Sequence, residues 1–215
     1  MYDSRRRPIR AALGSLCSRC GILSPPFSQA MAPLGSGNTP DRGVSVAAKV
    51  DIDIREAFLP TMEAMSRDGV LLVSLDARQR PGGMTFSWGT LGAIWGRHIF
   101  TILVRPSRNS FRLLESTGDF TVNVLPSSYA SAVDYWGKHS GREVDKWAKT
   151  GLTPSPSRRV RSPIVEQGIL HFECRIVHRH DLVAANLAPE LVPAYYPSGD
   201  LHRVYYGEIV ACYGL

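Results

Sequence analysis

Short runs of apolar and β-branched residues, each bounded by turn-forming residues, recur along this chain from residue 50 to its end. The clearest lies at 170–176, where apolar and polar residues alternate, as in a strand with one buried face. Comparable runs occupy 70–75, 84–88, 99–104, 120–125 and 203–213. Only short helical patterns separate these runs. The sequence therefore predicts a mainly β fold with short helices, most simply a closed antiparallel barrel.

The run at 99–104 is followed by a turn that is rich in anion-binding groups. Pro106 ends the strand, and Ser107 or Asn109 can cap a helix that ends near Gly118. The first amides of such a helix lack intrahelical partners and favour a phosphate. The polar side chains beside them belong to Arg105, Ser107, Arg108 and Ser110. From spacing alone, a surface turn with solvated arginines is the commoner arrangement.

The run at 84–88 is expected to pair with the strand at 70–75 through a turn at 76–83. Its alternation directs Met84, Phe86 and Trp88 to one side and the hydroxyls of Thr85 and Ser87 to the other. Trp88 has an equally simple interpretation as a core residue.

Six stretches occur in the order that is typical of a known family. They read SWGTLGAIWG, FTILVRPSRNSF, FTVNV, GKHSGREVDKW, HFECRIVH and YYPSGDLHRVYYGEIV, and they extend from roughly Leu59 to the last residue. Together they resemble the flavin reductase-like, flavoredoxin-type family. The resemblance implies an FMN-binding, antiparallel Greek-key split β-barrel that typically works as a homodimer.

The resemblance also implies which residues contact the cofactor. Strand 84–88 contacts the flavin in the family, and the lysine of its DVDK-like motif corresponds to Lys146, which would otherwise be a solvated surface lysine. The family commonly has Asn two residues before Met84, where this chain has Gly82, so that side-chain contact is missing or replaced by backbone. The full predicted set is Thr85, Ser87, Trp88, Arg105, Ser107, Arg108, Ser110 and Lys146.

The polar row of the 170–176 strand consists of His171, Glu173 and Arg175, and it is expected to face either the flavin or water. His178 and His180 follow without carboxylate partners at metal-ligand spacing. No metal site is predicted from them.

The net charge of +6 is concentrated at the start of the chain, where residues 1–40 carry +4 and leave +2 for the remainder. Residues 1–48 are rich in Arg, Ser, Pro and Gly, which predicts a disordered extension before a domain at 49–215. Met31 is an alternative start. The nearly balanced domain disfavours a nucleic-acid groove, and no stretch approaches the ~20 apolar residues of a membrane span.

The four cysteines favour a reduced, cytoplasmic protein. Cys17 and Cys20 form one CxxC pair, but a structural zinc site needs four ligands and no second pair follows. Cys174 and Cys212 lie in expected strands and are interpreted as small core residues.

The sequence contains no G-x-G-x-x-G, P-loop or G-x-S-x-G motif. A nicotinamide donor would therefore dock on the flavin itself, and no catalytic acid or base is predicted. One hypothesis is an oxidoreductase in which NAD(P)H reduces bound FMN, which passes electrons to free flavin, a partner protein or a small acceptor. The other is an FMN-binding electron carrier that does not oxidise NAD(P)H efficiently.

Overall fold

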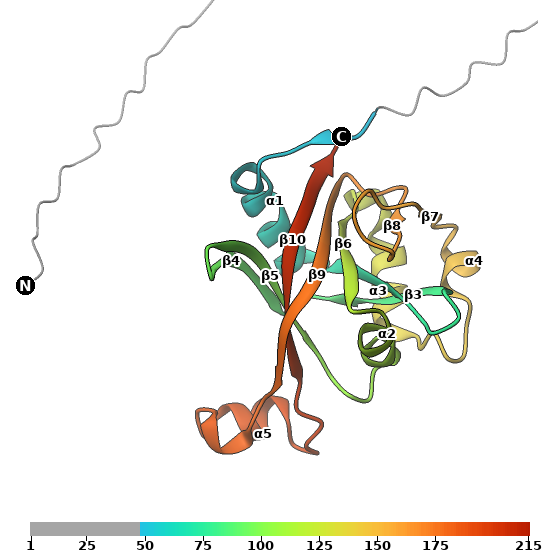
Figure 1. Cartoon of the computed structure of the whole chain (residues 1–215). Coiled ribbons are helices and arrows are strands. Elements are labelled where there is room, and N and C mark those ends of the chain that lie inside the picture. The colour runs from blue at the N-terminus through green and yellow to red at the C-terminus, as the bar shows by residue number, and fades with distance from the viewer. Residues whose placement is uncertain (1–47) are drawn as a thin grey trace, which may run out of the picture. The chain divides into compact units, whose positions relative to one another are not determined.

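An antiparallel eight-stranded sheet dominates the computed structural model, which describes residues 48–215 (Figure 1). Its strands are β1 (Val50–Asp51), β2 (Val70–Leu75), β3 (Pro81–Phe86), β4 (Gly89–Ile94), β5 (Arg97–Val104), β6 (Asp119–Val124), β9 (Leu170–Asp181) and β10 (Arg203–Gly214). A second small sheet pairs β7 (Pro154–Ser155) with β8 (Ile164–Val165). The helices are α1 (Ile54–Arg67), α2 (Asn109–Thr117), α3 (Ala130–Lys138), α4 (Lys146–Thr150) and α5 (Leu191–Tyr195), with 3-10 turns at Ser127–Tyr129 and Ala184–Asn186.

The main sheet is open, not closed. The strand order is β3-β2-β6-β9-β10-β5-β4, with β1 added to β10, and no ladder joins the edge strands β3 and β4 within residues 48–215. Helix α1 contributes Ala57, Ala64 and Met65 to the same core as Phe86 of β3 and Leu91 of β4. The mainly β prediction and the split barrel are therefore confirmed, whereas the closed barrel is wrong because helix side chains pack where a closing ladder would lie.

The turn that joins β2 to β3 is shorter than the sequence indicated. Strand β3 begins at Pro81, which pairs with Leu75, so the turn spans 76–80 and not 76–83. The carboxylate of Asp76 accepts hydrogen bonds from the amides of Arg78 and Arg80 and closes this turn. Because strand pairing starts at Pro81, directly after Arg80, the glycines at 82 and 83 belong to the strand.

Helix α1 contains Pro60 and continues through it. A proline has no backbone N–H, so Pro60 cannot donate the helical hydrogen bond to the carbonyl of Glu56. Both residues lie on the exposed face of the helix, where water can bond to that carbonyl. The N-terminus is capped by Asp53, whose side chain accepts from the Arg55 amide.

Two of the three side chains in the polar row of β9 are buried, whereas Arg175 is exposed to water as predicted. His171 and Glu173 are fully buried. The His171 ring contacts Asn123 Oδ1 of β6 (2.8 Å) and the carbonyl oxygen of Gly168 (3.1 Å). Glu173 accepts hydrogen bonds from the amides of Arg158, Arg159 and Val160. The expectation for these two side chains was wrong because their partners lie elsewhere in the chain, on β6 and after β8 for His171 and in the loop after β7 for Glu173. Alternation along a single strand cannot indicate such partners.

The remaining predictions divide between the core, the surface and the undescribed segment. Cys174 and Cys212 are buried free thiols, as predicted, and His178 and His180 are exposed. No group of metal ligands occurs among residues 48–215. None of the helices in this range is both long and apolar enough to cross a membrane. The predicted disorder of the N-terminal extension, its CxxC pair and the alternative start at Met31 lie outside the described residues.

Candidate functional site

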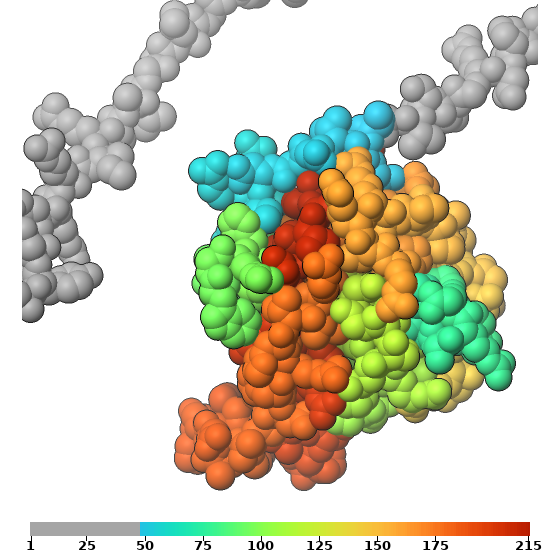
Figure 2. All heavy atoms as spheres, in the orientation of Figure 1, coloured from blue at the N-terminus to red at the C-terminus, as the bar shows by residue number. Residues whose placement is uncertain are grey.

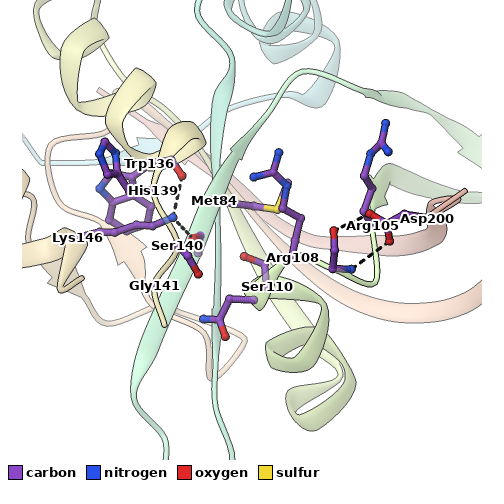
Figure 3. A pocket seen from close by; sticks show the side chains of 13 residues that line it. Met84, Arg105, Arg108, Ser110, Trp136, His139, Ser140, Gly141, Lys146 and Asp200 are labelled. Carbon is purple, nitrogen blue, oxygen red and sulfur yellow. Dashed lines mark hydrogen bonds between the residues drawn. The ribbon is translucent and has the colours of Figure 1, made fainter. Parts of the chain in front are cut away.

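A cavity of about 430 Å³ lies at the start of helix α2, between strand β3 and the turns that follow α3 and precede β10. Figure 3 shows Lys146 on one side of this cavity, Arg105 and Asp200 on the other, and Met84 between them. The lining residues are Gly83, Met84, Arg105, Ser107, Arg108, Asn109, Ser110, Trp136, His139, Ser140, Gly141, Lys146 and Asp200. Five of the eight predicted site residues therefore meet here, namely Arg105, Ser107, Arg108, Ser110 and Lys146.

The start of helix α2 presents its backbone amides to this cavity without a side-chain cap. Arg108 is the N-cap residue in extended conformation, and no side chain bonds to the first turn. The predicted capping by Ser107 or Asn109 is wrong, because the Ser107 side chain bonds elsewhere and Asn109 is already helical. The helix ends as predicted at Gly118, which has a left-handed φ of 78°. An uncapped start with its positive dipole end suits an anion.

Lys146 is a buried cation, which corrects the interpretation as a solvated surface lysine. Its side chain is buried because Asp145 caps α4 and turns Lys146 inward against Trp136. Nζ donates to the carbonyl oxygens of Gly83 (3.0 Å) and Trp136 (2.7 Å), and no carboxylate of residues 48–215 lies within salt-bridge distance. Burial, reinforced by the charge of Arg108, lowers the pKa of Lys146 to about 8.

The opposite side of the cavity is bonded to the segment that precedes β10. The carboxylate of Asp200 accepts hydrogen bonds from the amide (3.2 Å) and hydroxyl (2.5 Å) of Ser107. Arg105 donates to the carbonyl of Tyr195 at 2.8 Å. Arg108 makes one long contact, 3.4 Å to the Gly137 carbonyl, so its guanidinium keeps most of its donors available.

Thr85, Ser87 and Trp88 do not line the cavity. The Thr85 hydroxyl donates to the carbonyl of Val133 on α3, and Trp88 is 40% exposed and packs edge-on against Tyr195. Thr85 and Ser87 do share one side, as predicted, since a Cβ on Gly69 would lie 2.6 Å from Thr85 Cγ2 and 3.2 Å from Ser87 Oγ. The structure thus separates these three residues from the five that it gathers.

Gly82 has a structural explanation that the sequence did not provide. A Cβ at this position would lie 3.0 Å from Leu113 Cδ1 of helix α2, which is a tight contact. The backbone of the neighbouring Gly83 supplies the carbonyl that holds Lys146.

The description "Flavin reductase like domain" belongs to a family model that matches residues 62–214. The chain belongs to the flavin reductase-like family. Its fold is also that of solved structures with low sequence identity. Flavoredoxin of Desulfovibrio vulgaris (Miyazaki F) is 23% identical over 67% of each chain, with a TM-score of 0.54.

Two further structures agree with this fold. An FMN-binding protein from Thermus thermophilus with bound p-hydroxybenzaldehyde is 24% identical over 68% of this chain and 71% of its own, with a TM-score of 0.53. A Shewanella frigidimarina protein with a split barrel domain is 17% identical over 76% and 75%, with a TM-score of 0.57. These similarities place the flavin reductase-like chain in the split-barrel fold.

Five polar or aromatic members of the cavity are absent from the predicted site, namely Asn109, Trp136, His139, Ser140 and Asp200. Figure 3 shows Trp136 beside Lys146. His139 stacks on Tyr135 at 3.9 Å between ring centroids. Asp200 comes from a segment 93 residues after Ser107, and the only local signal was the Ser-Gly-Asp turn before the last strand.

Proposed function

We propose that this flavin reductase-like protein binds FMN and acts as an oxidoreductase in which NAD(P)H reduces the bound flavin. The observation that carries the proposal is the buried ammonium of Lys146, which has no carboxylate partner in the described chain and faces the uncapped start of α2. A buried cation is stabilised by a paired anion, and a phosphate at a helix start has that chemistry. Family membership and the FMN-binding relative support the choice of flavin.

In this proposal the chain's own residues bind and orient the cofactor. Arg108, Ser110 and the first amides of α2 would hold the phosphate, with the remaining proton of the Lys146 ammonium directed at it. Met84 would cover the cofactor from strand β3. When bound, FMN supplies the hydride and electron-transfer chemistry, and the protein supplies its position and electrostatic environment.

The flavin contacts of Thr85, Ser87 and Trp88 stay predictions. Trp88 is the best placed of the three, because it is exposed and packs on Tyr195, whose carbonyl binds Arg105 of the cavity. A flat aromatic side chain at that position suits stacking on a ring system.

The first experiment separates the proposed reductase from the alternative electron carrier. Purified protein loaded with FMN is mixed with NADH or NADPH in a stopped-flow instrument, and the flavin absorbance is followed. Rapid bleaching by one nucleotide supports the reductase. FMN that binds but bleaches only slowly with both nucleotides favours the electron carrier, in which small molecules or a protein exchange electrons with the flavin.

We also propose that the protein is a cytoplasmic homodimer. Trp95, at the tip of the β4–β5 hairpin, is 63% exposed and lies about 6.0 Å from the rings of His178 and Tyr206. Exposed aromatic clusters of this kind are enriched in interface cores, and β9 lies open on the face shown in Figure 2. Sedimentation of the wild type and a Trp95→Glu variant tests the dimer, and a wild type that sediments as a monomer contradicts it. The free thiols of Cys174 and Cys212 support the proposed cytoplasmic location, because thiols stay reduced in that compartment.

A further inference from the structure

The segment between β9 and β10 brings an acidic side chain to the edge of the cavity. Asp200 has a left-handed backbone, with φ of 55°, and its two carboxylate oxygens accept from the amide and the hydroxyl of Ser107. This is a bidentate contact between an anion and the turn that leads into α2. A phosphate at the start of α2 would use donors of the same kind.

The same segment also holds a cavity arginine. Arg105 Nη2 donates to the Tyr195 carbonyl at 2.8 Å, and its guanidinium lies 5.1 Å from the centroid of the Tyr196 ring. The Tyr196 hydroxyl is in turn 2.8 Å from Nδ1 of His202. Two of the five predicted phosphate-binding residues, Arg105 and Ser107, are thus bonded to residues 195–200.

We infer that Asp200 is an internal competitor for the flavin phosphate, so that residues 195–202 act as a latch that releases Ser107 when the phosphate binds. This inference rests on the proposed function. The amide and hydroxyl hydrogens of Ser107 cannot serve the carboxylate and a phosphate together. Two anions brought side by side in a partly buried cavity also repel each other.

The competition has a consequence for ligand choice. Riboflavin has no phosphate, so it neither needs the Ser107 donors nor repels Asp200. The Asp200 carboxylate therefore weakens the binding of FMN but not the binding of riboflavin. It reduces the ratio of the riboflavin dissociation constant to the FMN dissociation constant. The opposite arrangement is a permanent clamp, in which Asp200 orders the turn for the phosphate and its removal weakens FMN binding.

The test is the Asp200→Asn variant, whose side chain keeps its shape and tolerates the left-handed backbone while losing its charge. The matched control is Asp134→Asn, which removes an equal charge from an exposed pair with Lys138 on α3. Dissociation constants for FMN and riboflavin are measured by flavin fluorescence. We expect Asp200→Asn to bind FMN about three- to tenfold more tightly than wild type, with riboflavin unchanged, since charge-assisted bonds are about twice as strong as neutral ones. Asp134→Asn should match wild type for both.

A second measurement follows the latch directly. Hydrogen exchange of the wild type is compared with and without saturating FMN, and amides at 195–202 are expected to exchange faster when FMN is bound. Weaker or unchanged FMN binding in Asp200→Asn relative to Asp134→Asn, or slower exchange of 195–202, overturns the latch alone. A wild type that binds no FMN overturns the proposed function and the latch with it.

Discussion

The ammonium nitrogen of Lys146 lies 3.0 Å from the carbonyl oxygen of Gly83, which fastens the first residue of α4 to strand β3 beside the cavity. A second bond of 2.7 Å to the Trp136 carbonyl fixes the same nitrogen against α3. Three segments of the chain are thus held together by one cation. The neutral carbonyls leave its charge uncompensated, and an anionic ligand can compensate it.

Replacing Lys146 with Met should weaken FMN binding about ten- to hundredfold, because one charge-assisted bond to phosphate is worth about 1.5–3 kcal/mol and about 1.4 kcal/mol is tenfold in affinity. Riboflavin binding should change little. The variant should also lose about 1–3 kcal/mol of unfolding free energy, since the Gly83 and Trp136 carbonyls lose their donor. The measurements are flavin titration and urea denaturation. Lys149→Met, at an exposed position on the same helix, is the control and should match wild type.

The affinity for FMN should depend on pH through the same lysine. Its pKa is lowered to about 8, chiefly by burial, so the free protein carries the ammonium below that pH and loses it above. Since phosphate favours the charged form, affinity should be full below about pH 8 and fall as pH rises through it. Titrations between pH 7 and 9.5 test this. Lys146→Arg stays charged throughout and should remove the dependence, whereas an equal fall in both proteins would contradict the assignment.

Glu173→Gln should destabilise the fold by about 2–4 kcal/mol, because hydrogen bonds to a charged group contribute roughly 1.5–3 kcal/mol each and are not additive. The buried carboxylate accepts hydrogen bonds from three loop amides and from the Tyr213 hydroxyl. The NH2 group of a glutamine cannot accept these bonds and would face other donors. Urea denaturation measures the loss. Glu208→Gln alters an exposed pair with Arg97 and should stay within about 0.5 kcal/mol of wild type.

Gly69→Ala and Gly118→Ala form a matched pair that separates backbone strain from a steric clash. Both glycines have left-handed φ values, 86° and 78°, but a Cβ at Gly69 would lie 2.6 Å from Thr85 Cγ2, whereas one at Gly118 would meet nothing within 4 Å. Gly118→Ala should cost about 1 kcal/mol from strain, and Gly69→Ala about 2–4 kcal/mol. Equal losses of unfolding free energy in the two variants would show that the Thr85 side chain moves away from the new methyl group at no energetic cost.

The strands could be predicted from the sequence because each is encoded by its own residues. The predicted run at 70–75 is β2, and the predicted 99–104 lies within β5. Five of the cavity residues were also predicted, but only with the family resemblance, because a turn rich in arginine and serine and a lone lysine are by themselves typical of a solvated surface. Local alternation suffices for the strands.

Features that depend on distant contacts could not be predicted in this way. The burial of Glu173 depends on the loop at 158–160, whose amides bond to its carboxylate, and the bond of Ser107 depends on Asp200, 93 residues later. The open edge between β3 and β4 likewise depends on how α1 packs. In each case the deciding partner is remote in sequence, and a periodic pattern carries no information about it.

The most direct test of a phosphate-selecting flavin site is the ratio of riboflavin to FMN dissociation constants in the wild-type protein at pH 7. FMN should bind at least about tenfold more tightly than riboflavin, because only FMN offers a dianion to Lys146, Arg108 and the start of α2. Equal dissociation constants for the two flavins would contradict a phosphate-selecting site.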